Sequence, residues 1–248
     1  MTTPYDQIGA GYATTRATDL QIAAQIWAAL GSAETVVNVG AGSGSYEPLD
    51  RTVVAVEPSA VMIGQRRPDC APAVQASAES LPFADRSFDA AMAVLTIHHW
   101  ADPQRGLAEM RRVARRRVLV LTWDQDIFDT FWLVSHYVPA ITRLDRARSL
   151  SIPEITAALG PSTVVRLPIP ADCTDGFLGA FWRRPRAYLD PNVRSAISAF
   201  RQIEAAAEIA GIKHLTEDLA SGVWQQRYGN LLNLNALDIG YRLIITES

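Results

Sequence analysis

The feature that most constrains the fold of this 248-residue chain is a glycine-rich loop that directly follows a short apolar run. The run, Thr35–Val39, is rich in β-branched residues and predicts a buried strand. From Gly40 the loop reads Gly-Ala-Gly-Ser-Gly, and glycine lets the backbone turn sharply and a ligand approach where a Cβ would obstruct it. We expect a helix over Ser45–Leu49, whose N-terminus would offer free backbone N–H groups to a negative group.

The spacing of the loop separates it from a dinucleotide site. The pattern Gly-x-Gly-x-x-Gly requires a glycine three positions after Gly42, and Ser45 stands there. The loop therefore favours a ligand with an adenosine and a carboxylate but without a pyrophosphate. A tight turn that binds no ligand is the alternative.

The rest of the chain alternates between strand-like and helix-like segments. Further strands are predicted at Arg51–Val56, Ala71–Gln75, Phe88–Leu95, Arg117–Thr122, Thr163–Leu167 and Ile239–Thr246. Helices are predicted at 18–30, Ser59–Gln65, Pro103–Ala114, Ile197–Ala210 and Leu215–Gly222. Strands that are apolar on both faces and alternate with helices predict an α/β fold, a Rossmann-like doubly wound and mostly parallel seven-stranded sheet whose last two strands complete one edge.

An acidic residue stands at the tip of the second predicted strand. Glu57, followed by Pro58, lies 17 positions after Gly40. In such folds a carboxylate at this place accepts hydrogen bonds from the two ribose hydroxyls. Beside the glycine loop, Glu57 is therefore predicted to bind a sugar, although a surface glutamate at a strand end is the simpler alternative.

A third motif precedes the fourth predicted strand and carries a family resemblance. Residues 78–89 read A-E-S-L-P-F-A-D-R-S-F-D. With the two preceding motifs, this stretch resembles the class I S-adenosylmethionine (SAM)-dependent methyltransferases, and among them the family that includes the ubiquinone/menaquinone C-methyltransferases. The resemblance covers about residues 5–125. It implies a SAM methyltransferase that releases S-adenosylhomocysteine (SAH) and transfers the methyl group by in-line displacement to a small-molecule acceptor.

The resemblance also implies which residues bind SAM. The methionine part is expected at Gly40, Ala41 and Gly42, the ribose at Glu57, the adenine face at Met62, and the adenine edge along Ser77, Ala78 and Glu79, with Leu95 and Thr96 as walls of the site. Two positions depart from the family pattern. Asn38 stands where many relatives carry an acidic residue, so a water-mediated contact to the methionine ammonium is expected to be weaker or made elsewhere. Ser77 replaces a common Asp, and its hydroxyl can still accept a hydrogen bond.

The N-terminal stretch resembles the opening of the same family. It contains Tyr5, Tyr12 and Arg16, of which the last two would share one face of a helix and could close over the SAM carboxylate. A start without a functional role is the alternative.

The acceptor side of the site is less well defined by sequence. His98 and His99 follow the fourth strand and are candidate catalytic residues that could orient a nucleophile or accept its proton, although a packing role stays open. Aromatic residues beyond the fifth strand either line an acceptor pocket or pack in the core; they include Trp123, Phe128, Trp132, Tyr137, Phe177, Phe181 and Trp182. The acidic and histidine residues show no metal-ligand spacing, so no metal is predicted.

Residues 1–248 are interpreted as one methyltransferase domain. The expected SAM-binding core is about 30–125 plus strands near 162–168 and 238–246, and the expected cap is about 126–160 and 172–235. The net charge of −3 argues against a nucleic-acid partner. We expect a cytoplasmic protein without a membrane span or secretory signal; the oligomeric state is open.

Two other functions are compatible with parts of the pattern. A SAM-binding protein without catalysis would share the cofactor motifs. A nicotinamide-dependent oxidoreductase is disfavoured, because it requires a pyrophosphate loop and a constellation such as Tyr-x-x-x-Lys, and the chain has a single lysine, Lys213.

Overall fold

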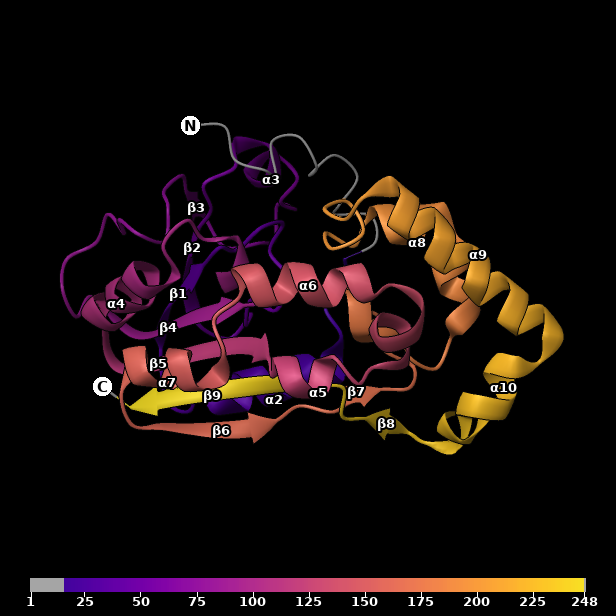
Figure 1. Ribbon diagram of the computed structural model, residues 1–248. Coiled ribbons are helices and arrows are strands. Elements are labelled where there is room, and N and C mark those ends of the chain that lie inside the picture. The colour runs from indigo at the N-terminus through magenta and orange to yellow at the C-terminus, as the bar shows by residue number, and fades with distance from the viewer. Residues whose placement is uncertain (1–15, 248) are drawn as a thin grey trace.

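The computed structural model describes residues 16–247, and within them a seven-stranded sheet forms the centre of the molecule (Figure 1). Its strands lie in the order β3-β2-β1-β4-β5-β9-β6. They are β1 (Thr35–Val39), β2 (Thr52–Val56), β3 (Ala73–Val74), β4 (Phe88–Val94), β5 (Ala114–Trp123), β6 (Ser162–Arg166) and β9 (Tyr241–Glu247). The first five run parallel, and β9 pairs antiparallel with both β5 and β6. The predicted doubly wound, mostly parallel sheet is confirmed, including the last two strands at one edge.

Successive strand residues point to opposite sides of the sheet, and the central strands are buried on both faces. Val36 packs in one apolar cluster with Ile22 and Ile26 of helix α2 (Leu20–Ala29). Its neighbour Val37 packs in the other cluster, which contains residues of α4 (Pro103–Val113) and α7 (Ile152–Leu159). Helices on each side therefore account for the continuous apolar strands.

The strand order reverses between β1 and β4. From β1 the chain continues to β2 on one side, whereas β4 leads to β5 on the other. Loops that leave two neighbouring strands in opposite directions open a crevice at their carboxyl ends, where ligands bind in open α/β sheets. Short helices flank this edge, namely α3 (Ala60–Gly64) after β2 and the 3₁₀ turn η2 (Ile97–His99) after β4.

The second half of the chain adds helices and a small ribbon. The helical elements are α5 (Gln125–Phe128), the π-helical turn η3 (Leu133–Tyr137), α6 (Pro139–Arg148), η4 (Leu178–Phe181), η5 (Pro185–Leu189), α8 (Pro191–Ser195), α9 (Ala205–Ser221), α10 (Val223–Tyr228) and η6 (Gly229–Asn233). A two-stranded ribbon, β7 (Ile169–Pro170) with β8 (Ala236–Leu237), was not predicted. In Figure 1, α8, α9 and α10 form an outer arm at one end of the molecule.

This arm is joined to the sheet by aromatic packing. Trp132 contacts Trp224 edge to face, with ring centroids 5.4 Å apart, and Trp132 also meets Tyr188. These buried rings belong to the same apolar cluster as α2 and one face of the sheet. The arm therefore shares a core with the sheet.

Three of the predicted helices differ from the structure. Ser45–Leu49 forms turns, because only residues 40–51 connect β1 to β2, Tyr46 has φ +65° and Pro48 lacks an N–H. Instead of helices at Ile197–Ala210 and Leu215–Gly222, one helix, α9, begins at Ala205 and passes through Gly211. Glycine is required at Gly211 because a Cβ there would lie 2.2 Å from the carbonyl oxygen of Tyr137. Over residues 16–247, no helix combines the length and apolarity needed to cross a bilayer.

Candidate functional site

A cavity of about 630 Å³ lies at the crevice between the loops that follow β1 and β4; it is referred to below as the large cavity. It collects almost every site residue predicted from the sequence that falls within the described range. These are Arg16, Asn38, Gly40, Ala41, Gly42, Glu57, Pro58, Met62, Ser77, Ala78, Glu79, Leu95, Thr96 and His99. His98 lines a neighbouring cavity instead, and Tyr5 and Tyr12 lie outside the described residues.

The glycine loop folds closely against the end of β4. Gly40 has φ +71°, and a Cβ built on it would lie 2.2 Å from the side-chain oxygen of Thr96. Only glycine combines this backbone conformation with so close a neighbour. The loop therefore leaves an open floor to the large cavity where a side chain would otherwise stand.

Several backbone N–H groups of this loop donate to other groups of the protein. Those of Gly40 and Ala41 donate to the carbonyl of Val56, and that of Gly42 donates to Glu57 at 2.9 Å. Since no helix follows, the expectation that a helix N-terminus offers free N–H groups to a ligand is wrong.

Glu57 is buried at the end of β2, and its carboxylate is fixed by backbone. One oxygen accepts from Gly42 N and the other from Ser59 N, each at 2.9 Å. These two bonds hold the carboxylate at the wall of the large cavity. Ser59 also caps α3 by accepting from Met62 N, which holds the buried Met62 beside the loop.

A second buried carboxylate, which sequence reasoning missed, lies behind Asn38. The amide Nδ2 of Asn38 donates to Glu47 at 3.1 Å, and Glu47 forms a buried ion pair with Arg66 at 2.7 Å. Arg66 also donates to the carbonyl of Gly42 at 3.1 Å. Glu47, nine residues beyond Asn38, thus places an acidic group behind this strand end, where it holds Asn38 and Arg66.

The loop after β4 forms the opposite wall. Leu95 has φ +52°, a conformation that costs a non-glycine residue energy and that tends to occur at functional sites. One oxygen of Glu79 accepts from Ala101 N at 2.9 Å and Asp102 N at 3.2 Å, so Glu79 fixes this loop as well as lining the cavity. 

Arg16 is held by a buried acid from the second half of the chain. Its guanidinium donates to both oxygens of Asp175, at 2.6 and 3.0 Å, and the hydroxyl of Tyr46 donates to the same carboxylate at 2.7 Å. The Asp175 side chain is fully buried. Sequence reasoning missed Asp175 and Tyr46, and the role of Arg16 as part of a lid stays a prediction.

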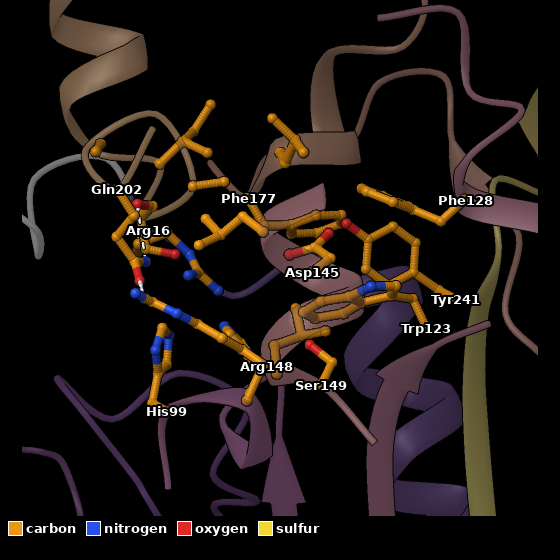
Figure 2. Close-up of a pocket in the computed structure, with 18 residues that line it drawn as sticks. Arg16, His99, Trp123, Phe128, Asp145, Arg148, Ser149, Phe177, Gln202 and Tyr241 are labelled. Carbon is orange, nitrogen blue, oxygen red and sulfur yellow. Dashed lines mark hydrogen bonds between the residues drawn. The ribbon is translucent and has the colours of Figure 1, made fainter. Parts of the chain in front are cut away.

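A second, smaller cavity of about 70 Å³, referred to below as the aromatic cavity, adjoins the large one. Arg16, Leu95 and His99 line both. Its walls include Trp123, Phe128, Phe177 and Tyr241, with Asp145, Arg148, Ser149 and Gln202 as polar members (Figure 2). The aromatic residues left open by the sequence all pack in or against one core cluster, and of these Trp123, Phe128 and Phe177 also line the aromatic cavity, whereas Trp132, Tyr137, Phe181 and Trp182 do not.

Both histidines are uncharged at neutral pH. Burial, together with Arg16 and Arg148, lowers the pKa of His99 from 6.5 to about 4. Burial, together with His99 and Arg16, holds the pKa of His98 well below 6.5. Each ring can therefore accept a hydrogen bond at neutral pH, but with such pKa values each is a weak proton acceptor. Within residues 16–247, no group of His, Cys, Asp and Glu side chains is arranged to hold a metal ion.

Comparison with known proteins agrees with this arrangement. Residues 37–122 match the family described as methyltransferase domain. A crystal structure of an Anabaena variabilis protein, described as a methyltransferase from an antibiotic biosynthesis pathway, is 32% identical with a TM-score of 0.86, over 94% of this chain and 98% of the other. 

Two further relatives are more distant. The geranyl diphosphate C-methyltransferase of Streptomyces coelicolor, solved with SAH, shares the fold at 15% identity and a TM-score of 0.53, over 92% of this chain and 75% of the other. A tRNA (carboxymethyluridine(34)-5-O)-methyltransferase of Xenopus tropicalis is 25% identical over 168 residues, which is 67% of this chain. The chain spans only 26% of the length of that curated relative.

Proposed function

The chain belongs to the class I SAM-dependent methyltransferases, and from this premise we propose that its methyl acceptor is a small molecule held in the aromatic cavity. One observation carries the proposal: the two cavities share Arg16, Leu95 and His99, so that a ligand in each would meet at these residues. Methyl transfer requires the donor and the nucleophile side by side with water excluded. Two adjoining cavities of different character provide such a place.

We propose that the residues around the large cavity hold SAM as their chemistry suggests. The floor at Gly40 lacks a Cβ, the carboxylate of Glu57 is of the kind that binds the two ribose hydroxyls, and buried Met62 offers an apolar surface to the adenine. Bound SAM supplies a methyl group on a positively charged sulfur, which a nucleophile attacks in line.

The protein itself contributes to methyl transfer mainly by positioning the acceptor and by excluding water. The strained backbone at Leu95 and the 3₁₀ turn after it set His99 at the boundary of the two cavities. As an uncharged ring, His99 accepts a hydrogen bond from the acceptor and orients it; its low pKa makes it a poor base. The segments 126–160 and 172–235 serve as a cap over the acceptor.

A nucleic-acid acceptor fits less well. The relative from Xenopus tropicalis acts on tRNA, but the present chain covers a quarter of it and carries a net charge of −3. Phosphate backbones favour a basic surface. The small, aromatic-walled second cavity suits a small molecule.

The test is methyl transfer from isotopically labelled SAM to a panel of small metabolites, with total tRNA as a separate arm. We expect SAH to form together with a labelled small molecule. Transfer to tRNA in place of any metabolite would overturn the small-molecule acceptor. Residues that line the aromatic cavity are then substituted one at a time. Weaker binding of the acceptor with an unchanged affinity for SAH would locate the acceptor in this cavity.

A further inference from the structure

The aromatic cavity gathers buried polar groups that have no hydrogen-bond partner among the described residues. Across residues 16–247, five buried side-chain N or O atoms lack a hydrogen-bond partner, and three of them belong to residues that line this cavity: Trp123 Nε1, His98 Nδ1 and Ser149 Oγ. Each unpaired buried polar group costs roughly 1–3 kcal/mol, and most proteins leave few of them. Three around one small space point to a ligand that completes them.

Asp145 adds an acid to the same wall. Its side chain reaches into the cavity between Phe177 and Tyr241 in Figure 2. Among the described residues, its carboxylate forms no hydrogen bond or ion pair, and its burial, aided by Asp129, raises its pKa from 3.8 to about 7. A carboxyl group in an apolar pocket without a donor is costly unless a ligand provides that donor.

The nearby arginines are engaged with other groups. Arg146 pairs outward with Asp126 and Asp129. Arg148 donates to Gln202 at 2.5 Å, and Arg16 binds Asp175. Because these arginines bind other groups, the carboxylate of Asp145 is available to a ligand in the cavity.

These polar groups stand on rigid supports. Trp123 is the last residue of β5 and pairs in the sheet with Tyr241 of β9. The amide of Gln125 donates to the carbonyls of Asp145 and Ser149, at 3.3 and 3.0 Å, and so ties the last turn of α6 to the end of β5. An arrangement fixed in this way is prepared for its ligand before binding.

The size of the cavity limits what can enter it. By the same measure of volume, one buried water needs about 10–15 Å³. A cavity of about 70 Å³ thus has room for roughly five waters, or for one six-membered ring with a short substituent. Its aromatic walls favour a flat, apolar ring.

We propose that Asp145 recognises the methyl acceptor by accepting a hydrogen bond from an amine or hydroxyl group carried by a single apolar ring, while the Trp123 indole N–H is available to an acceptor atom of the same ligand. This inference rests on the proposed function, since it assigns the aromatic cavity to the acceptor. Amines and hydroxyls share the feature that Asp145 would recognise, namely an N–H or O–H donor beside a ring.

The experiment uses fragment probes on the full chain saturated with SAH. Benzylamine and benzyl alcohol carry the donor; benzyl methyl ether and ethylbenzene match them in shape without it. Binding is measured by ligand-observed NMR titration on the wild type, on Asp145→Leu and Asp145→Asn, and on Asp126→Asn as the control. Asp126 is a matched control because its exposed carboxylate pairs with Arg146, the residue after Asp145.

We expect the donor-bearing probes to bind the wild type at least tenfold more tightly than the two others, since a hydrogen bond to a charged group has about this effect. Asp145→Leu should abolish the preference and Asp126→Asn should keep it. In Asp145→Asn, a larger loss for benzylamine than for benzyl alcohol would identify a cationic amine, and equal losses a neutral donor.

Equal binding of all four probes to the wild type, or no binding of any, would overturn the inference, as would a preference that survives in Asp145→Leu. These outcomes leave SAH binding intact. Loss of SAH binding by the wild type would instead contradict the proposed function itself, so that the two failures are distinguishable.

Discussion

Arg16 and Asp175, 159 residues apart in the chain, form a two-bonded ion pair in which the carboxylate is fully buried. The pair joins the segment before α2 to the loop before η4, and it does so at the boundary of both cavities. Asp19 reinforces the same junction, since its carboxylate caps α2 and also accepts from Thr174 N. The site is thus assembled from both halves of the chain.

Replacing Asp175 with Ala should lower the free energy of unfolding by about 3–5 kcal/mol, because it removes a fully buried carboxylate that accepts from both Arg16 and Tyr46. Urea denaturation of the wild type and the variant measures the change. Asp172→Ala, at an exposed position whose carboxylate accepts only from exposed Gln21 among the described residues, should stay within about 0.5 kcal/mol of the wild type. Equal changes in the free energy of unfolding for the two substitutions would show that the ion pair of Asp175 with Arg16 does not stabilise the fold.

Gly40→Ala should destabilise the protein by about 2–4 kcal/mol, since it combines a left-handed backbone with a contact to Thr96 that is far too short. Gly64→Ala is the control, because Gly64 ends a helix and a Cβ there meets nothing within 4 Å. That change should be neutral or stabilise by up to about 1 kcal/mol. Thermal unfolding compares the two, and a neutral Gly40→Ala would show that the loop adopts another conformation.

The stability of the Asp145→Asn variant should depend on pH relative to the wild type. The pKa of Asp145 is raised from 3.8 to about 7 in the folded state, so the folded protein retains a proton that the unfolded chain releases between these values. The wild type therefore loses stability as pH rises through this window, and the ionised group is fully destabilising above it. Asp145→Asn should be more stable than the wild type by roughly 2–4 kcal/mol at pH 8, with the difference vanishing near pH 4.

Urea denaturation at several pH values gives this difference directly. Asp126→Asn, which removes an exposed carboxylate nearby, should show a pH dependence parallel to the wild type. If Asp145→Asn destabilises the protein at pH 8, the carboxylate already has a partner within the protein and is not available to bind a ligand. A gain in stability joined to a loss of acceptor binding is the expected signature of a binding residue.

The sequence was sufficient to predict those parts of the fold and site that are formed by residues adjacent to one another in the chain. β1 was predicted with the correct bounds, and the loop from Gly40 and the acid Glu57 follow their strands directly, so local patterning sufficed. The motif before β4 likewise placed Ser77–Glu79 at the large cavity. All three depend on contacts close to the end of one strand.

The remaining features depend on contacts between distant segments. The role of Asp175 depends on Arg16, and the role of Glu47 depends on Arg66 and Asn38. No local sequence pattern predicts either pairing. The bounds of α9 depended on Gly211, which reads as a break in sequence but is required by the close approach of Tyr137. Asp145 could have been found, because it follows Ile141 by one helical turn where the apolar face of α6 should continue.

Titration calorimetry with SAH, on the wild type and on Glu57→Ala, tests the central claim most directly. The account predicts binding of one SAH per chain by the wild type and a loss of about 2–3 kcal/mol, or at least thirtyfold, on removal of the carboxylate that accepts from the ribose. Asp50→Ala, at an exposed carboxylate, should bind like the wild type. A wild type without measurable affinity for SAM or SAH, or a folded Glu57→Ala that binds SAH equally well, would contradict it.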